Sequence, residues 1–269
     1  MIQPRGTASG QTSGAGPLVP RSAATLGCRP EPIACHRLPR HQQGQPATGE
    51  EAIASAERTL AYVDEFLPED EALQAARRHA AEVGGTVPVS PATGATLRFI
   101  AAAAAARSVV EIGTGCGTSG IWLLRGMRSG GVLTSVDVEP EYQRLARQGF
   151  AAAGFAASRS RLISGRALEV LPRLADGAYD LVFCDADPRE YGDYLSAAMR
   201  LLRPGGIVAF EGALPASRVM DSLLGDPVPV DRDAAEITEL REQVRSDGRL
   251  LPLLLPLGAG LLAEVRREG

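Results

Sequence analysis

The chain contains no lysine, so all 28 of its lysine-or-arginine positions are arginine. Without a side-chain amine of that kind, the chain cannot form a lysine Schiff base or use lysine as a general base. No apolar run approaches the roughly 18 residues of a membrane span, and a net charge of -4 offers no broad basic surface. We therefore expect neither a membrane nor a nucleic acid as partner.

The four cysteines of the chain do not have the spacing of a disulfide framework. Cys116 and Cys184 lie far apart in the predicted globular part, which is typical of reduced thiols in a cytoplasmic protein. The other two lie near His36 and His41, but this spacing lacks the paired pattern of zinc ligands. The sequence predicts a cytoplasmic protein without a zinc site.

Residues 1–49 differ in composition from the rest of the chain. They are rich in Gly, Pro, Ser, Gln and Arg, contain Glu31 as their single acid, and have neither helical nor strand periodicity. We expect a disordered N-terminal extension here, followed by one catalytic domain over residues 50–269. A transit peptide is a second interpretation of an arginine-rich, acid-poor segment, whereas a secretory signal would need an apolar core.

From Glu50 onward the pattern is first helical and then alternating. Helices are expected over residues 50–66, 69–83 and 90–106, the last with a serine cap and a first-turn proline. Short strands and helices then alternate, which is the mark of a parallel sheet with helices on both faces. The expected strands are 108–112, 132–137, 160–164, 179–184 and 206–210, and the intervening helices start at Thr118, Glu139, Leu168 and Tyr191.

The C-terminus departs from this alternation. Two β-like runs, residues 250–257 and 261–266, are joined by Gly258-Ala259-Gly260 and predict a hairpin. The fold class is therefore α/β, a doubly wound and mostly parallel sheet with an antiparallel last strand and N-terminal helices. We expect residues 213–233 to form a lid-like loop over an acceptor pocket, and residues 236–245 to form a solvated structural helix.

The segment from Val109 to Ser119, with the sequence VVEIGTGCGTS, carries the most information about function. It predicts a buried strand, a turn with three glycines and a helix start. Glycine adopts positive φ and removes each Cβ that would keep a ligand from the main chain. Asp137 ends the next strand, where a carboxylate can accept two ribose hydroxyls. Together these features predict a pocket for a nucleoside-bearing cofactor.

Two cofactors are compatible with such a pocket. Gly115, Gly117 and Gly120 spell the GxGxxG pattern of nicotinamide enzymes, but the pattern begins two residues late, since Gly113 already ends the strand. Glu111 suits the cationic sulfonium and ammonium of S-adenosylmethionine better than a pyrophosphate. We predict S-adenosylmethionine. A nicotinamide oxidoreductase remains the alternative, although the chain lacks a later Tyr/Lys pair.

Several motifs together resemble the S-adenosylmethionine-dependent O-methyltransferase family that includes the caffeoyl-CoA and catechol enzymes, most closely its small actinobacterial branch. They are the first-strand turn, Asp137, Asp185-Ala186-Asp187, Arg203-Pro204-Gly205-Gly206 and the terminal hairpin. The likeness covers about residues 50–267. It implies a seven-stranded Rossmann-like sheet, an enzyme that moves a methyl group to a hydroxyl of a small-molecule acceptor, and a homodimer.

The resemblance also implies roles for single residues. Asp185 corresponds to the catalytic acid that faces the acceptor substrate, through a divalent metal in the better-known members. Without a ligand, Asp185 and Asp187 would be a solvated turn that caps the following helix. The cofactor-binding positions fall on Val89, Glu111, Gly113, Thr114, Ser119, Asp137, Val138 and Asp187.

Two departures from the family pattern lie in the acceptor site. The metal-dependent members carry an acid and an asparagine after the fifth strand, where this chain has Glu211 and Gly212. Magnesium needs several oxygen ligands. The candidate ligands in this chain are Asp185 and Glu211, so the sequence does not support an intact magnesium site. The lysine expected after Asp187 is replaced by proline and arginine, which leaves Asp185, Asp187 or Glu211 as candidate bases. A non-catalytic S-adenosylmethionine-binding protein is therefore a further alternative.

Overall fold

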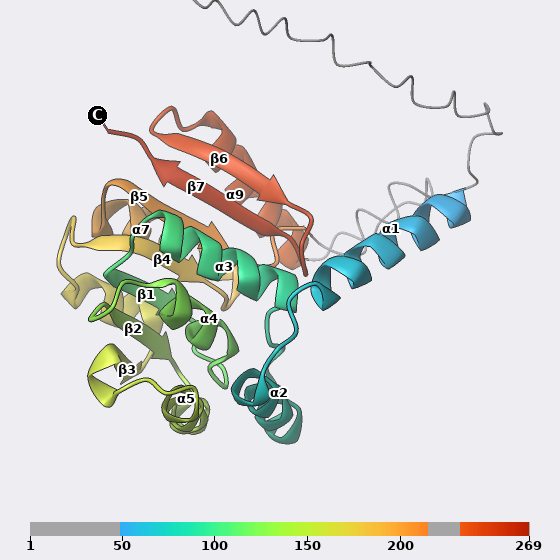
Figure 1. Cartoon of the computed structure of the whole chain (residues 1–269). Coiled ribbons are helices and arrows are strands. Elements are labelled where there is room, and N and C mark those ends of the chain that lie inside the picture. The colour runs from blue at the N-terminus through green and yellow to red at the C-terminus, as the bar shows by residue number, and fades with distance from the viewer. Residues whose placement is uncertain (1–48, 215–231, 269) are drawn as a thin grey trace, which may run out of the picture. The chain divides into compact units, whose positions relative to one another are not determined.

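The computed structural model describes residues 49–214 and 232–268, in which seven strands form one sheet (Figure 1). The strand order is β3-β2-β1-β4-β5-β7-β6. The first five strands pair in parallel, and β7 runs antiparallel between β5 and β6. This confirms the predicted fold class, the antiparallel last strand and the terminal hairpin. The strands are β1 (Ser108–Ile112), β2 (Val132–Asp137), β3 (Ser160–Ser164), β4 (Tyr179–Cys184), β5 (Leu202–Phe210), β6 (Leu250–Leu255) and β7 (Leu261–Arg266).

Helices cover both faces of the sheet and bury one apolar cluster on each. One cluster receives side chains from α2, α3, α4 and α5, and the other from α6, α7 and α9. Apolar burial on both faces explains why the central strands are continuous hydrophobic runs. The helices are α1 (Gly49–Glu65), α2 (Glu71–Val83), α3 (Pro91–Ala103), α4 (Thr118–Gly126), α5 (Pro140–Ala152), α6 (Ala167–Val170), α7 (Tyr191–Leu201) and α9 (Arg232–Ser246), with short 3-10 turns η1 (Ala157–Arg159), η2 (Leu171–Arg173) and η3 (Pro188–Glu190).

Helix α3 and strand β5 have bounds that differ from those expected. Helix α3 ends at Ala103 and not at Ala106, because Ala105 takes φ +50° and Ala106 N donates to Ala101 O as the chain turns into β1. The path that the chain must take into β1 therefore overrides the helix propensity of alanine. Strand β5 starts at Leu202, but the pairing shifts so that residues 203–206 bulge and regular pairing resumes at Ile207.

The apolar stripes of the first two helices differ in burial. On α2, Leu73 and Ala80 are buried in the core. Val63 on α1 is 38% exposed, and Phe66 just after its end is 70% exposed, although Asp64 fixes the helix by accepting a hydrogen bond from Ala92 N at 2.9 Å. The α1 stripe is therefore largely exposed to solvent.

Helix α9 is longer than expected and not fully solvated. It begins at Arg232, and its Ile237, Leu240 and Val244 side chains are buried against the sheet. The expected surface pairing is present, because Arg245 bonds Glu242 at 2.6 Å. The helix is thus a structural layer with one solvated face.

Some expectations fall outside the described residues. The N-terminal extension, with its transit-peptide and zinc alternatives, lies in residues 1–48, and most of the expected acceptor lid lies in residues 215–231. Within the ranges that are described, no helix combines the length and apolar character needed to cross a membrane.

Glu264 on β7 is a buried carboxyl group without a hydrogen-bond partner among the described residues. Burial raises its pKa to about 8. Since the folded pKa lies above the unfolded value, the group lowers stability as pH rises from about 4.5 to about 8. Glu264→Met is expected to raise the free energy of unfolding by about 1–3 kcal/mol at pH 8 and by little at pH 5. Urea denaturation at both pH values measures this, and an equal gain at both would contradict it.

Candidate functional site

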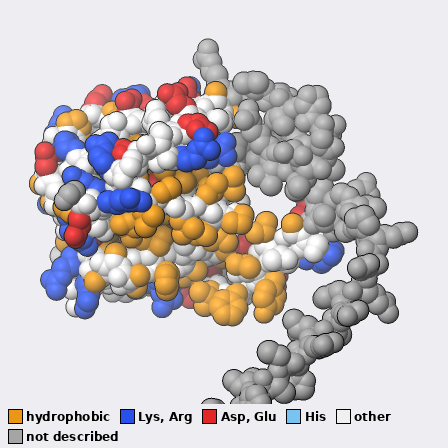
Figure 2. Space-filling model, turned by 90° about the horizontal axis from the view of Figure 1, so that it is seen from above, with side chains coloured by type: hydrophobic (Ala, Val, Ile, Leu, Met, Phe, Trp, Pro, Cys, Tyr) orange, Lys and Arg blue, Asp and Glu red, His pale blue; other side chains and the backbone are white. Residues whose placement is uncertain are grey.

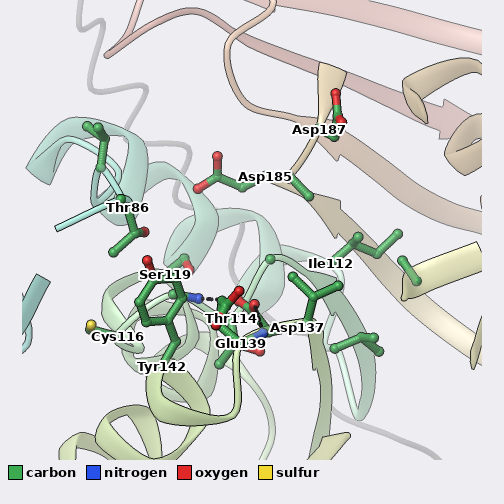
Figure 3. A pocket seen from close by; sticks show the side chains of 18 of the residues that line it. Thr86, Ile112, Thr114, Cys116, Ser119, Asp137, Glu139, Tyr142, Asp185 and Asp187 are labelled. Atoms are coloured by element: carbon green, nitrogen blue, oxygen red, sulfur yellow. Dashed lines mark hydrogen bonds between the residues drawn. The ribbon is translucent and has the colours of Figure 1, made fainter. Parts of the chain in front are cut away.

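A pocket of about 580 Å³ lies at the carboxyl ends of β1, β2 and β4 (Figure 3). In the strand order, β1 is flanked by β2 on one side and β4 on the other. Strands β2 and β3 are added toward one edge of the sheet and β4 and β5 toward the other, so the order of strands switches at this point. Ligands of open α/β sheets bind at such switch points. The pocket is lined by residues 85–89, 112–116, 118–119, 136–139, 142, 165–167, 185–187, 190 and 194.

Glycine is required in the turn between β1 and α4 because the protein itself leaves no room for side chains. Gly113 has φ +93°, and a Cβ there would overlap the carbonyl oxygen of Asp185. Gly117, the cap of α4, has φ +94°, and its Cβ would lie 2.9 Å from Ala146 Cα. The expectation that these glycines make room for a ligand is corrected for Gly113 and Gly117, since their space is taken by β4 and α5.

Asp137 lies at the tip of β2 and faces the pocket. Its Oδ2 accepts from Gly115 N at 2.9 Å, and its Oδ1 accepts from Glu139 N at 2.9 Å. The carboxylate thus ties the glycine turn to the end of β2 and still has lone pairs for a ligand hydroxyl. Val138 beside it lines the pocket and is 56% exposed, a flat apolar surface at the position expected for the adenine.

Glu111 lies behind the pocket wall. It is fully buried and is not among the described residues that line the pocket. Its two oxygens accept from Ser119 Oγ at 2.7 Å and Ser135 Oγ at 2.6 Å, and Ser135 also bonds Thr114. Burial raises the pKa of Glu111 to about 8 despite these hydroxyl donors. The structure therefore shows Glu111 as an anchor for Ser119 and Thr114, both of which line the pocket.

A second wall comes from residues 84–89 between α2 and α3, which we call the strap. Of the strap, the sequence predicted only Val89, which is buried and lines the pocket. The strap lies over the glycine turn, because a Cβ on Gly115 would be 3.0 Å from Thr86 Oγ1. Here the missing side chain makes room for the strap.

Asp185 and Asp187 follow β4 and both line the pocket, but their side chains point in different directions (Figure 3). No described residue forms a hydrogen bond to the Asp185 carboxyl group, and burial, together with the nearby Asp137, raises its pKa to about 7. Asp187 accepts from Arg189 N at 3.0 Å and pairs with its guanidinium, which lowers the Asp187 pKa. Asp187 thus caps the 3-10 turn η3, as expected for a turn without a ligand. The Asp185 carboxyl group, in contrast, is unpaired among the described residues.

Among the described residues, the predicted metal ligands Asp185 and Glu211 lack the companion side chains that a magnesium site needs, although Glu211 Oε2 is buried without a partner. Glu211 Oε1 already accepts from Ala259 N at 3.4 Å and Thr93 Oγ1 at 3.5 Å, and Glu211 does not line the described pocket. Burial and then the charge of Asp185 raise the Glu211 pKa to about 8. Gly212 supplies no side chain where the resemblance expects asparagine. Across residues 49–214 and 232–268, no three His, Cys, Asp or Glu side chains are grouped to hold a metal.

Several residues that line the pocket were not predicted from the sequence. Thr118 Oγ1 at the start of α4 is buried, faces the pocket and has no partner among the described residues. Tyr142 and Tyr194 also line it, as do the strap and residues 165–167. The adjacent glycines at 84 and 85 were the one available signal for the strap. Tyr142 lies five residues after Asp137, and nothing in its spacing indicates a role in the pocket.

Comparisons with known proteins agree on one family. The O-methyltransferase family model matches residues 63–267. A Mycobacterium avium protein assigned as an O-methyltransferase is 46% identical over 220 residues, which are 82% of this chain and 96% of that protein. The solved O-methyltransferase TomG from Streptomyces achromogenes, in complex with S-adenosylmethionine, is 27% identical with a TM-score of 0.67, over 79% of this chain and 96% of that one. An O-methyltransferase from Bacillus cereus, in complex with S-adenosylhomocysteine, is 26% identical with a TM-score of 0.68, over 78% and 97%.

The fold and the pocket define a Rossmann-like α/β protein that takes a ligand at the carboxyl ends of its parallel strands. The chain belongs to the O-methyltransferase family. This confirms the predicted family and class of enzyme, and it disfavours the nicotinamide oxidoreductase.

Proposed function

We propose that this protein transfers the methyl group of S-adenosylmethionine to a hydroxyl of a small-molecule acceptor. One observation carries the proposal: a pocket at the switch point joins the β2 acid Asp137 with Asp185, a half-buried carboxyl group that no described residue pairs. The complexes of TomG and the Bacillus cereus enzyme support the choice of cofactor.

In the proposed mechanism the acceptor oxygen attacks the methyl carbon in line with the sulfur. The carbon–oxygen bond forms as the carbon–sulfur bond breaks, and the sulfonium becomes a neutral thioether. Asp185 accepts the hydroxyl proton, because its pKa of about 7 leaves it partly ionised at neutral pH. Holding donor and acceptor in a near-attack arrangement supplies up to roughly 7–11 kcal/mol.

The cofactor roles follow from the positions of the side chains. Asp137 would accept the ribose hydroxyls, with Val138 beside the adenine and Val89 on the strap wall. Ser119 and the backbone of Gly113 and Thr114 would hold the amino-acid end at the start of α4, where backbone N–H groups are unpaired. Glu111 would act through Ser119. Asp187, in the turn after β4, would lie beside the cofactor.

Calorimetry with S-adenosylmethionine and S-adenosylhomocysteine, followed by turnover on a panel of phenols with and without magnesium, tests the proposed function. We expect binding of both cofactor forms and methylation that does not require added magnesium. No binding of either form would refute the proposal. Binding without turnover on any phenol would favour a non-catalytic binding protein.

Asp137→Ala is expected to weaken S-adenosylhomocysteine binding by about 1–3 kcal/mol, or roughly 5-fold to 150-fold, because it removes a partly buried acceptor for the ribose hydroxyls. The change also frees Gly115 N, so the melting temperature is measured in parallel. Asp137→Asn serves as the companion variant, since it keeps one oxygen acceptor. Unchanged affinity in the alanine variant would remove the ribose assignment.

We also propose that two copies of the chain associate through an open apolar face. Figure 2 shows hydrophobic side chains gathered over β6 and α3. Phe66 and Phe99 are 70% and 72% exposed and border an apolar groove, and Leu251 and Leu253 on the edge strand are each 54% exposed. A contiguous apolar patch of this kind marks an interaction surface. Sedimentation equilibrium measures the association, and a monomer at micromolar concentration would contradict it.

We propose a cytoplasmic location because the described cysteines are unpaired. Cys116 and Cys184 are free and buried on the described part of the chain. Unpaired buried thiols are typical of a reducing compartment.

A further inference from the structure

The strap, residues 84–89, is attached mainly at its two ends. Gly84 and Gly85 open it with φ of +67° and +73°. Within the described residues, the backbone groups of residues 85–88 form no backbone hydrogen bonds, and Val87 is 89% exposed. All of residues 85–89 nevertheless line the pocket. Whatever holds the two ends therefore decides whether this wall stays in place.

At its second end the strap is held by Arg77 of α2. Arg77 Nη2 donates to Val89 O at 2.6 Å and to Glu69 Oε1 at 2.8 Å. Glu69 is only 7% exposed, so this anchor is a partly buried ion pair. The next residues enter α3, which packs on α4 in the core. This end is part of the rigid scaffold.

At its first end the strap is held by the hydroxyl of Tyr142, which donates to Gly84 O at 2.8 Å. Tyr142 belongs to α5, the helix that follows Asp137, and it also lines the pocket. Glycine is needed beside the bond, because a Cβ on Gly85 would lie 2.7 Å from the hydroxyl oxygen. This end is thus held across the pocket rim by one side-chain hydrogen bond.

The ring of Tyr142 packs against three segments of the chain beside the pocket. It packs on Ala80 of α2, on Leu145 of α5 and on Cys116 of the glycine turn, and Figure 3 shows the ring next to Cys116. The ring contacts do not depend on the hydroxyl group. Removing the oxygen atom alone would remove the bond to Gly84 O and leave the ring packed in this cluster.

We propose that Tyr142 is a positioning residue that holds the strap over the cofactor and so sets how long the cofactor stays bound. The inference rests on the proposed function, because S-adenosylmethionine is taken as the ligand. Two glycines with left-handed φ next to the bond form a hinge at low steric cost. When the bond opens, the part of the wall that carries Thr86 and Val87 can move away from the pocket.

The test compares the unmodified protein with Tyr142→Phe and with a matched control, Tyr179→Phe, on β4 outside the pocket. Stopped-flow displacement measures the dissociation rate of S-adenosylhomocysteine. Tyr142→Phe is expected to release it about fivefold faster, the ratio for one neutral hydrogen bond of about 1 kcal/mol, and the control is expected to match the unmodified protein. Hydrogen exchange of the loaded protein should become faster at Gly84, whose amide donates to Ala80 O, in Tyr142→Phe alone.

The possible failures are distinguishable. If the unmodified protein binds S-adenosylhomocysteine and Tyr142→Phe releases it at the same rate, the role of Tyr142 is refuted and the proposed function stands. Faster exchange along the whole chain with a lower melting temperature would also refute it, since this indicates general destabilisation. If the unmodified protein does not bind S-adenosylhomocysteine, the proposed function fails and the inference fails with it.

Discussion

Asp185→Asn is expected to lower kcat by about 10²-fold to 10⁴-fold, the usual contribution of a positioned proton acceptor. Asparagine preserves the shape of the side chain but cannot take the hydroxyl proton at neutral pH. S-adenosylhomocysteine affinity should change little, because Asp137 and the glycine turn hold the cofactor in the proposed site. Methyl transfer to a responsive phenol, measured alongside calorimetry, separates the two effects.

The pH dependence of kcat/KM is an independent test of Asp185 as the base. Burial and the nearby Asp137 raise the Asp185 pKa to about 7, so the carboxylate is lost as pH falls below that value. We expect kcat/KM of the unmodified enzyme to fall about tenfold per pH unit below pH 7, and this limb to vanish in Asp185→Asn. Asp193→Asn, the same change at an exposed position of α7, is the control. Equal loss in both variants, or an acid limb that survives in Asp185→Asn, would exclude Asp185 as the base.

Gly113→Ala is expected to destabilise the fold by about 2–6 kcal/mol. The left-handed φ of +93° costs about 1–3 kcal/mol for a residue with a side chain. The overlap of the new Cβ with the Asp185 carbonyl adds an overpacking cost of about 1–3 kcal/mol, because backbone on both sides must move. Urea denaturation gives the free energy of unfolding, and cofactor affinity is expected to fall with it.

The control for this prediction is Gly154→Ala. Gly154 has a similar φ of +86°, but a Cβ there would have no atom within 4 Å. The difference between the two variants therefore isolates the clash from the conformational cost. Equal destabilisation in both would mean that β1 and β4 can separate at the turn, which would contradict the account of why glycine is needed at position 113.

Much of the fold was accessible from the sequence because hydrophobic patterning is a local property. The apolar runs that became β1 and β4 are buried on both faces, and the cap at Ser90 marks where α3 begins. Ala105 shows the limit. Its helix propensity is high, but the entry of the chain into β1 requires positive φ there, and that requirement is set by the position of the sheet.

Part of the candidate site was also predictable, since Asp137 ends β2, Asp185 follows β4, and these strand ends meet at one edge of the sheet. The function of Glu111 was less accessible. A sequence shows an acid two residues before a glycine, but only the packed structure shows its carboxylate bonded to Ser119 and Ser135 behind the pocket wall. Glu211 likewise bonds Thr93 and the hairpin backbone, which its position in the sequence does not reveal.

By itself, the sequence determined the order of strands and helices, the three glycines of the turn and the acids that end β2 and follow β4, because each depends on neighbouring residues along the chain. The tertiary structure decided which atoms make those glycines necessary, which carboxyl groups remain unpaired, and that a tyrosine from α5 holds the segment between α2 and α3. These depend on contacts between residues distant in sequence, such as Tyr142 and Gly84, and no local pattern encodes such a distance.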